Sequence, residues 1–361
     1  MSNNQRLYMD MHILQTVPPS CVNRDDTGSP KMAVYGGVTR ARVSSQSWKR
    51  AMRLMFHDFL TEDQLGYRTK RIIGMVADEV RKLGGADPET STKTIMEDAG
   101  LKIKSVEKGT DALFFISSMQ ARALAELIVY GPKTEKKATQ KALQKALNEN
   151  PSIDIALFGR MVADDPLLKI DACAQVAHSI STHKVMNEYD YFTAVDDMAP
   201  EDNAGAGHIG SVEYNSSTLY RYATVAIHDL QKQIGDLTVH VACEFVRAFA
   251  CSMPTGKQNT FANRTLPDAL LVCLRTDQPI NLVGAFEKPV PASDEGYVAV
   301  SANRLYAHAR DLYTSFAGSP AAVFVTGKLL DAFAEPMPLP SLLDTLAIDL
   351  SARLANNGGN P

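Results

Sequence analysis

The sequence predicts an α+β fold in which sheet-forming segments are interrupted by a helical insertion. Strand patterns lie near the N-terminus, at residues 7–14, and return at 220–227, 269–275 and 322–325. From about residue 60 to 177 helical patterns dominate instead. The 361 residues, 45% of them hydrophobic and 22% charged, suffice for about two domains that need no disulfide or metal to be stable.

Composition narrows the class of protein. The longest apolar stretches, such as 269–274, are too short for a membrane span, and the first residues carry no signal-peptide core. The five cysteines are odd in number and form no C-x-x-C pair, which argues against a disulfide framework and a zinc knuckle. We therefore expect a cytoplasmic protein that has no membrane contact. With a net charge of −4, a nucleic-acid ligand would need a local basic patch.

The first strand is predicted from strict alternation over residues 7–14. Its odd-numbered positions, from Leu7 to Ile13, are apolar, whereas Tyr8, Asp10 and His12 alternate with them. This pattern predicts a half-buried strand with the polar residues facing away from the core. Proline and glycine punctuate the next segment, 15–44, for which we predict a loop of about 30 residues, a length that usually means function or disorder.

A helix with one basic face is predicted next. Ser44 or Ser45 can cap it, and Trp48, Met52 and Met55 recur at helical spacing to form its buried face. Its opposite face carries Gln46, Lys49, Arg50 and Arg53.

A protruding hairpin is predicted between residues 184 and 217. Its first strand is aromatic, and its centre, from Asp196 to Gly210, is acidic and rich in glycine, as suits a flexible tip. Further segments complete the α+β part. They are a strand at 220–227, a helix at 237–250, a strand at 269–275, a helix at 303–316 and a strand at 322–325.

Positive charge is concentrated in one segment. Residues 24–53 hold seven basic residues and two acidic ones, a local charge of +5 in a chain of −4. The basic residues are Arg24, Lys31, Arg40, Arg42, Lys49, Arg50 and Arg53. Such segregation fits a phosphate-binding face, and the serines at the helix start offer backbone N–H groups as well. A solvated basic surface beside a loop explains the same composition, so both interpretations remain open.

Enzyme signatures are weak. The run 205–210 fits G-x-G-x-x-G, but it follows an acidic loop and leads into no helical pattern, so we reject a dinucleotide site. Asp25 and Asp26 could ligate Mg²⁺, although adjacent loop carboxylates are more often solvated or paired. His178 and His183 do not share a helical face, so satisfied or exposed histidines are favoured over metal ligands.

Several motifs resemble those of the CasC-type backbone subunit of the type I-E CRISPR Cascade complex, within the repeat-associated RNA-binding protein superfamily. The most specific are Cys21-Val-Asn-Arg-Asp-Asp26, Gly36-Gly37 and Arg42-Val-Ser-Ser-Gln-Ser-Trp-Lys-Arg-Ala-Met-Arg53. The resemblance continues, in family order, at 154–161, 177–183, 191–197, 220–223 and 256–262. It therefore covers nearly the whole chain.

The resemblance implies a ferredoxin-like, RRM-related palm with an inserted helical fingers domain and a β-hairpin thumb. Placed on this sequence, the palm would comprise residues 1–58 and 216–361 together with 177–183. The fingers would be 59–176 and the thumb 184–215.

The resemblance also implies a non-catalytic scaffold. Its partners would be a CRISPR RNA guide, the target DNA strand paired to it, head-to-tail copies of itself, and the large, small and end-capping Cascade subunits, with no cofactor, metal or catalytic residue. The residues expected to grip the guide backbone are Arg24, Lys31, Arg42, Ser44, Gln46, Lys49, Arg50, Arg53 and Lys257. Those expected to displace guide nucleotides periodically, at the base of the thumb, are Arg160, Met161, Phe192 and Thr193.

Two other functions remain open at this point. Related backbone subunits of type III systems cut RNA, so Asp25 or Asp26 could serve a metal-dependent ribonuclease. The chain could also be a free-standing RNA-binding module. No nucleic-acid contact is assigned to 289–293, because the resemblance implies lysines there and this chain has Pro-Val-Pro-Ala-Ser.

Overall fold

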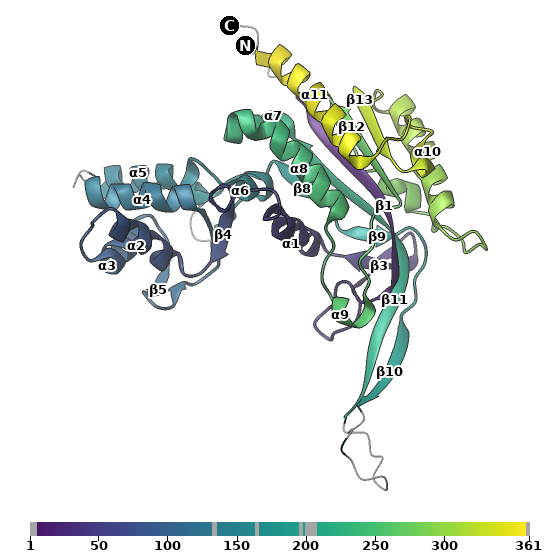
Figure 1. Cartoon of the computed structure of the whole chain (residues 1–361), viewed down its shortest axis with the longest axis horizontal. Coiled ribbons are helices and arrows are strands. Elements are labelled where there is room, and N and C mark those ends of the chain that lie inside the picture. Colours follow the sequence, from purple (N-terminus) through teal and green to yellow (C-terminus); the bar gives the residue numbers. More distant parts are fainter. Residues whose placement is uncertain (1–5, 132–135, 163–165, 195–197, 199–207, 359–361) are drawn as a thin grey trace. The chain divides into compact units, whose positions relative to one another are not determined.

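The computed structural model divides into two compact units (Figure 1). It describes residues 6–131, 136–162, 166–194, 198 and 208–358. The unit that we call the helical unit holds 53–175 and 225–244, and the one that we call the sheet unit holds 6–52, 176–224 and 245–361. The helices α1 (Ser45–Phe56) and α8 (Thr238–Cys251) and the strands β8 (Ala174–Val176) and β11 (His208–Ala226) have residues in both.

The sheet unit is built on one large sheet, which confirms the predicted α+β class. The strand order is β13-β12-β1-β11-β9-β3-β2, and β10 also pairs with β11. The further strands are β1 (Tyr8–Ser20), β2 (Met32–Tyr35), β3 (Val38–Val43), β9 (Ser179–Ser181), β10 (Glu188–Ala194), β12 (Ala269–Arg275) and β13 (Ala322–Thr326). The helices α9 (Gln258–Phe261), α10 (Val298–Ser315) and α11 (Leu339–Gly358) complete the unit, and Figure 1 shows α10 and α11 beside β12 and β13.

Strand β1 is longer and more deeply buried than the sequence predicts. The prediction that Asp10 and His12 face away from the core is wrong, because both are buried. Leu14 packs on this face of the sheet with Leu305 of α10. On the other face, the side chain of Arg221 joins the sheet to Phe249 of α8. A strand covered on both faces does not need polar residues at every second position.

The prediction of a loop over residues 15–44 is also wrong for most of this segment. Strand β1 continues to Ser20, and β2 and β3 form a hairpin, so that only residues 21–31 connect β1 to β2. Tyr35 pairs with Val38 across a two-residue turn, in which Gly36 and Gly37 both have positive φ, 58° and 75°. This is the backbone that two-residue hairpins favour, so Gly36-Gly37 was the signal for strands that the loop prediction overlooked.

Helix α11 is a second element that the sequence analysis missed. Its buried residues Leu342, Leu346 and Leu350 recur every four positions, which is the spacing of a helix face that packs on a core. The helix contacts β13, the edge strand of the sheet.

The helical unit contains the segment predicted to be an insertion. Its helices are α2 (Ile72–Lys82), α3 (Pro88–Asp98), α4 (Ser118–Tyr130), α5 (Lys136–Asn148), α6 (Ile153–Phe158) and α7 (Ile227–Ile234), with short strand pairs β4 (Gly66–Thr69) with β7 (Phe114–Ser117) and β5 (Ile103–Ser105) with β6 (Gly109–Thr110). A shared core includes Ile73, Met96, Leu124 and Leu143, and α4 and α5 lie side by side (Figure 1).

Residues 225–244 cluster with the helical unit, whereas the sequence placed them in the palm. The N–H of Ala226 donates to the carbonyl of Cys173, and α7 contacts α6. Tertiary contacts, not chain order, therefore decide which unit these residues join. No helix in the described ranges is long and apolar enough to cross a membrane.

The predicted hairpin is formed by β10 and β11, which pair in antiparallel register from Glu188 with Tyr214 to Ala194 with His208. Figure 1 shows it extending away from α10 and α11, and every residue of β10 is exposed. The ring of Phe192 lies across Gly210, where a Cβ would come within 2.5 Å of it. Most of the predicted acidic tip lies outside the described residues.

Asp10 makes the stability of the sheet unit depend on pH. Its carboxylate accepts hydrogen bonds from the Tyr222 hydroxyl (2.9 Å) and the Ile280 N–H (2.8 Å), and burial raises its pKa from 3.8 to about 6. Between pH 3.8 and about pH 6 the Asp10 carboxyl keeps its proton in the folded chain but releases it in the unfolded chain. The stabilisation that Asp10 provides is therefore present below pH 4 and is lost as pH rises through 6. It is worth about 3 kcal/mol.

We therefore expect the difference in unfolding free energy between wild type and Asp10→Asn to shrink by about 2 kcal/mol from pH 4 to pH 6.5. Urea titrations across this range would measure it. The comparison cancels the opposite contribution of buried His12, whose pKa is lowered to about 3 by burial. A difference that stays constant with pH would contradict the prediction.

Candidate nucleic-acid interface

The loop 21–31 is held in one conformation by its own polar side chains. Asp25 Oδ1 accepts hydrogen bonds from the Thr27 N–H (3.0 Å), the Thr27 hydroxyl (2.7 Å) and the Ser29 N–H (3.0 Å). These bonds, above all the one from the Thr27 hydroxyl, lower the pKa of Asp25. Asn23 Oδ1 accepts the N–H of Ser44 at 2.9 Å. The loop is thus tied to the start of α1.

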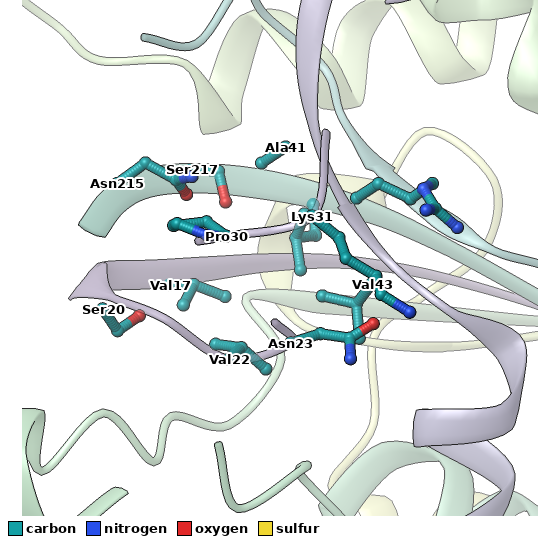
Figure 2. A pocket seen from close by; sticks show the side chains of 12 residues that line it. Val17, Ser20, Val22, Asn23, Pro30, Lys31, Ala41, Val43, Asn215 and Ser217 are labelled. Atoms are coloured by element: carbon teal, nitrogen blue, oxygen red, sulfur yellow. The ribbon is translucent and has the colours of Figure 1, made fainter. Parts of the chain in front are cut away.

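A pocket opens between this loop, the end of β1, and the strands β3 and β11. Figure 2 shows the Lys31 side chain running past Val43 on one side of the pocket, whereas Asn215 and Ser217 lie on the other. Its lining residues are Val17, Ser20, Val22, Asn23, Pro30, Lys31, Ala41, Arg42, Val43, Asn215, Ser217 and Leu219. Lys31 and Arg42 are the charged residues among them.

Arg42 is oriented by three contacts. Its backbone N–H donates to the Lys31 carbonyl (2.9 Å), and its Nε donates to the Met32 carbonyl (3.2 Å). Its Nη1 lies 3.1 Å from His178 Nδ1. Partial burial and the charges of Arg42 and Lys31 lower the pKa of His178. The three side chains therefore form one positively charged group, which the sequence analysis did not assemble because His178 is 136 residues from Arg42.

Arg24 of the loop 21–31 and Lys257, directly before α9, both act on the thiol of Cys21. Burial raises the pKa of the Cys21 thiol, and the positive charges of Arg24 and Lys257 oppose this rise. The backbone of Gly256 lies against the carbonyl of Val22, which a Cβ on Gly256 would approach to 2.1 Å. The structure therefore brings Lys257 close to the loop 21–31, and its role in guide binding stays a prediction.

Helix α1 begins as the sequence predicts. The Ser44 hydroxyl accepts the Ser47 N–H at 3.3 Å, which confirms the cap, and buried Trp48 donates through Nε1 to the Ser179 hydroxyl at 2.9 Å. Gln46 and Arg50 are exposed. Ser44 is buried, with 6% of its surface exposed. Its hydroxyl is therefore occupied in capping the helix.

Two of the seven basic residues between 24 and 53 have partners within the fold: Arg40 is buried, and Arg53 is half-buried. Arg40 is buried and donates to the carbonyls of Tyr35, Ser181, Phe286 and Glu287. These bonds satisfy its guanidinium within the protein. The open positive surface is therefore smaller than the charge count of the segment predicts.

Arg53 is the second of these residues. It belongs to the helical unit, where its Nε donates to the buried carboxylate of Asp154 at 2.9 Å and its guanidinium lies over the Phe115 ring. A buried partner thus already neutralises the charge of Arg53, and its contact with RNA, expected together with Lys49 and Arg50, stays a prediction.

The candidates for displacing nucleotides occur in both units. Met161 is 86% exposed and lines a surface pocket of the helical unit together with Leu113, which is also exposed. Leu113 has no role in the sequence analysis. In the sheet unit, Phe192 is 40% exposed, and Thr193 beside it is exposed as well.

Arg160 does not fit the wedge role. It is 2% exposed, and it donates to the carbonyls of Leu168 (2.9 Å), Phe115 (3.3 Å) and Leu147 (2.6 Å). Burial lowers its pKa to about 10. Arg160 therefore holds the chain next to Met161 in place and does not itself reach a surface.

His183 and the sequence after Gly207 both belong to the sheet unit. His183 Nε2 accepts the Thr218 N–H (3.1 Å), and its Nδ1 lies 2.9 Å from the Lys184 carbonyl, so this histidine is satisfied as predicted. The sequence after Gly207 enters strand β11, not a helix, which agrees with rejecting a dinucleotide site. Within the described ranges, no three His, Cys, Asp or Glu side chains gather as a metal site would require.

The family model of the CT1975-like proteins matches residues 9–340. The chain belongs to this family. This confirms the resemblance to CasC-type Cascade backbone subunits that its motifs indicate. No curated protein matches the chain.

Two solved structures are similar to this family member over nearly its whole length. A chain of a "CRISPR RNA-guided surveillance complex, pre-nicking" is 32% identical with a TM-score of 0.80, and the match covers 95% of this chain and 99% of that one. A chain of a "CRISPR RNA-guided surveillance complex" is 29% identical with a TM-score of 0.64, again covering 95% and 99%.

Proposed function

We propose that this chain is a non-catalytic, guide-RNA-binding backbone subunit of a CRISPR surveillance complex. The observation that carries the proposal is the open basic surface around the loop 21–31, formed by Arg24, Lys31, Arg42 and Lys257. It occurs in a chain whose similar structures are titled as RNA-guided surveillance complexes. A basic surface of this kind binds phosphates and accepts any sequence, which a guide scaffold requires.

The guide backbone is held at two adjoining places. The loop surface supplies the four cations, and the first turns of α1 supply Gln46, Lys49 and Arg50 with the backbone N–H groups that follow the Ser44 cap. A helix N-terminus favours an anion. Contacts to phosphate fix the path of the strand and leave base edges available for pairing with a target DNA strand.

The hairpin of β10 and β11 is the element that interrupts the guide at intervals. Exposed Phe192 and Thr193 on the hairpin, and exposed Met161 in the helical unit, are apolar or small surfaces suited to contact a displaced base. Unstacking a base costs a few kcal/mol, which such contacts offset. Copies of the chain stack head to tail along one guide, together with the large, small and end-capping subunits. A repeated heterologous contact that does not close into a ring builds such a filament.

The ribonuclease alternative is disfavoured by the conformation of Asp25. One of its carboxylate oxygens receives three hydrogen bonds from its own loop, which is the arrangement of a structural turn. Asp26 is exposed next to it. We therefore propose that Asp25 shapes the loop that presents Arg24 and Lys31.

Purification followed by RNA sequencing and mass determination tests the proposal. We expect the full chain, expressed with the other subunits and a CRISPR array, to retain RNA of defined length in a particle that contains several copies. A chain that stays monomeric and carries no RNA under these conditions would contradict it.

The same particle tests catalysis. We expect it to leave guide-complementary RNA and DNA intact with Mg²⁺ or Mn²⁺. Metal-dependent cleavage that is lost in Asp25→Ala or Asp26→Ala would establish the nuclease instead.

A further inference from the structure

His178 is an exposed histidine in the sheet unit to which neither the sequence motifs nor the proposed function assigns a role. It precedes β9 and lies beside Arg42 of β3, with its Nδ1 3.1 Å from Arg42 Nη1. Lys31, from the end of the loop 21–31, also acts on the imidazole. Among the described residues, these two cations are the charged groups that face it.

The contact with Arg42 determines the protonation state of the free imidazole. A guanidinium can only donate, so Nδ1 accepts and the single ring proton sits on Nε2. The site then presents Nε2–H, the guanidinium and the Lys31 ammonium, all of them donors. Partial burial, and after it the neighbouring cations, lower the pKa of His178, which favours the neutral ring before a ligand binds.

A group made of donors alone lacks an acceptor, and a phosphate supplies several. When a phosphate oxygen takes over the Arg42 N–H, Nδ1 loses its donor and is free to bind a proton from solvent. The phosphate charge opposes the two cations that had disfavoured the imidazolium. Protonated His178 then donates to the phosphate as well.

We propose that His178 completes a phosphate site with Arg42 and Lys31 and takes up one proton when the guide binds. This inference rests on the proposed function, because it requires that RNA occupies this surface. It adds a residue to the site and makes guide affinity dependent on pH near neutrality.

The test measures the affinity of the full chain for a fluorescent oligouridine at fixed salt between pH 8 and pH 6, a range in which uracil does not titrate. We expect wild type to bind several-fold more tightly at pH 6 than at pH 8, because a shift of about one pKa unit on binding gives at most about tenfold. His178→Asn keeps an acceptor close to the position of Nδ1 but cannot be protonated, so its affinity should change less than twofold. His57→Asn, at another exposed histidine, should behave like wild type.

Calorimetry in two buffers of different ionisation enthalpy provides an independent reading, because it counts the protons taken up per RNA bound. We expect a positive uptake at pH 7 for wild type that is absent in His178→Asn. Equal pH profiles and equal proton uptake in the two proteins would overturn the role of His178. Failure of wild type to bind RNA at any pH would instead overturn the proposed function.

Discussion

Replacing Lys31 and Arg42 together with alanine is expected to weaken guide RNA binding about a hundredfold at 0.15 M salt and to reduce the slope of log affinity against log salt by about two. Both residues line the pocket beside the loop 21–31, where Arg42 is oriented by Met32 and His178. Each neutralised phosphate releases counterions, so each lost contact reduces the salt dependence. Affinities at four or five salt concentrations measure both effects.

A matched control removes the same charge elsewhere in the sheet unit. Arg310 of α10 and Lys328 are exposed and lie outside the loop region, so their double alanine variant should change affinity less than threefold by long-range electrostatics alone. Similar losses in the two double variants would mean that bulk charge, not this site, holds the guide.

Asp154→Ala is expected to destabilise the helical unit by about 3 kcal/mol. The buried carboxylate accepts from Arg53 Nε (2.9 Å), the Gly66 N–H (2.8 Å) and the Ser152 hydroxyl (2.7 Å). Its removal leaves three donors without their acceptor, one of them a guanidinium. Urea unfolding would show a lower midpoint with an unchanged slope.

The control for Asp154 is an ion pair in solvent. Glu126→Ala removes the partner of Arg122 on α4, where both side chains are at least half exposed, so a loss below about 0.5 kcal/mol is expected. Asp154→Asn, which keeps acceptor oxygen but not charge, should fall between the two. If Asp154→Ala costs no more than Glu126→Ala, the pair with Arg53 is not structural, and Arg53 returns to the candidate RNA contacts.

Local patterns were predicted well because their determinants are close in sequence. The cap at Ser44 acts on Ser47, three residues away, and Trp48 and Met52 share the buried face of the same helix turn by turn. The hairpin of β10 and β11 is likewise visible in a short segment. For strand β1, alternation predicts burial of one face only. This prediction is wrong because helices cover both faces of the strand.

The roles of individual charges could not be predicted. The sequence does not distinguish Arg40, Arg53 and Arg160, whose charges have partners within the fold, from the open cations Lys31 and Arg42. Their partners, such as Phe286 for Arg40 and Asp154 for Arg53, are 246 and 101 residues away. No local pattern contains such a pairing.

The sequence by itself determined the α+β class, the family and the segment of the chain in which the basic surface lies, because these follow from periodicity, motifs and composition. Only the tertiary structure decided which cations remain open to a ligand and that His178 joins them. The physical reason is that a charge serves the fold when distant carbonyls or carboxylates satisfy it, and is available for binding when they do not.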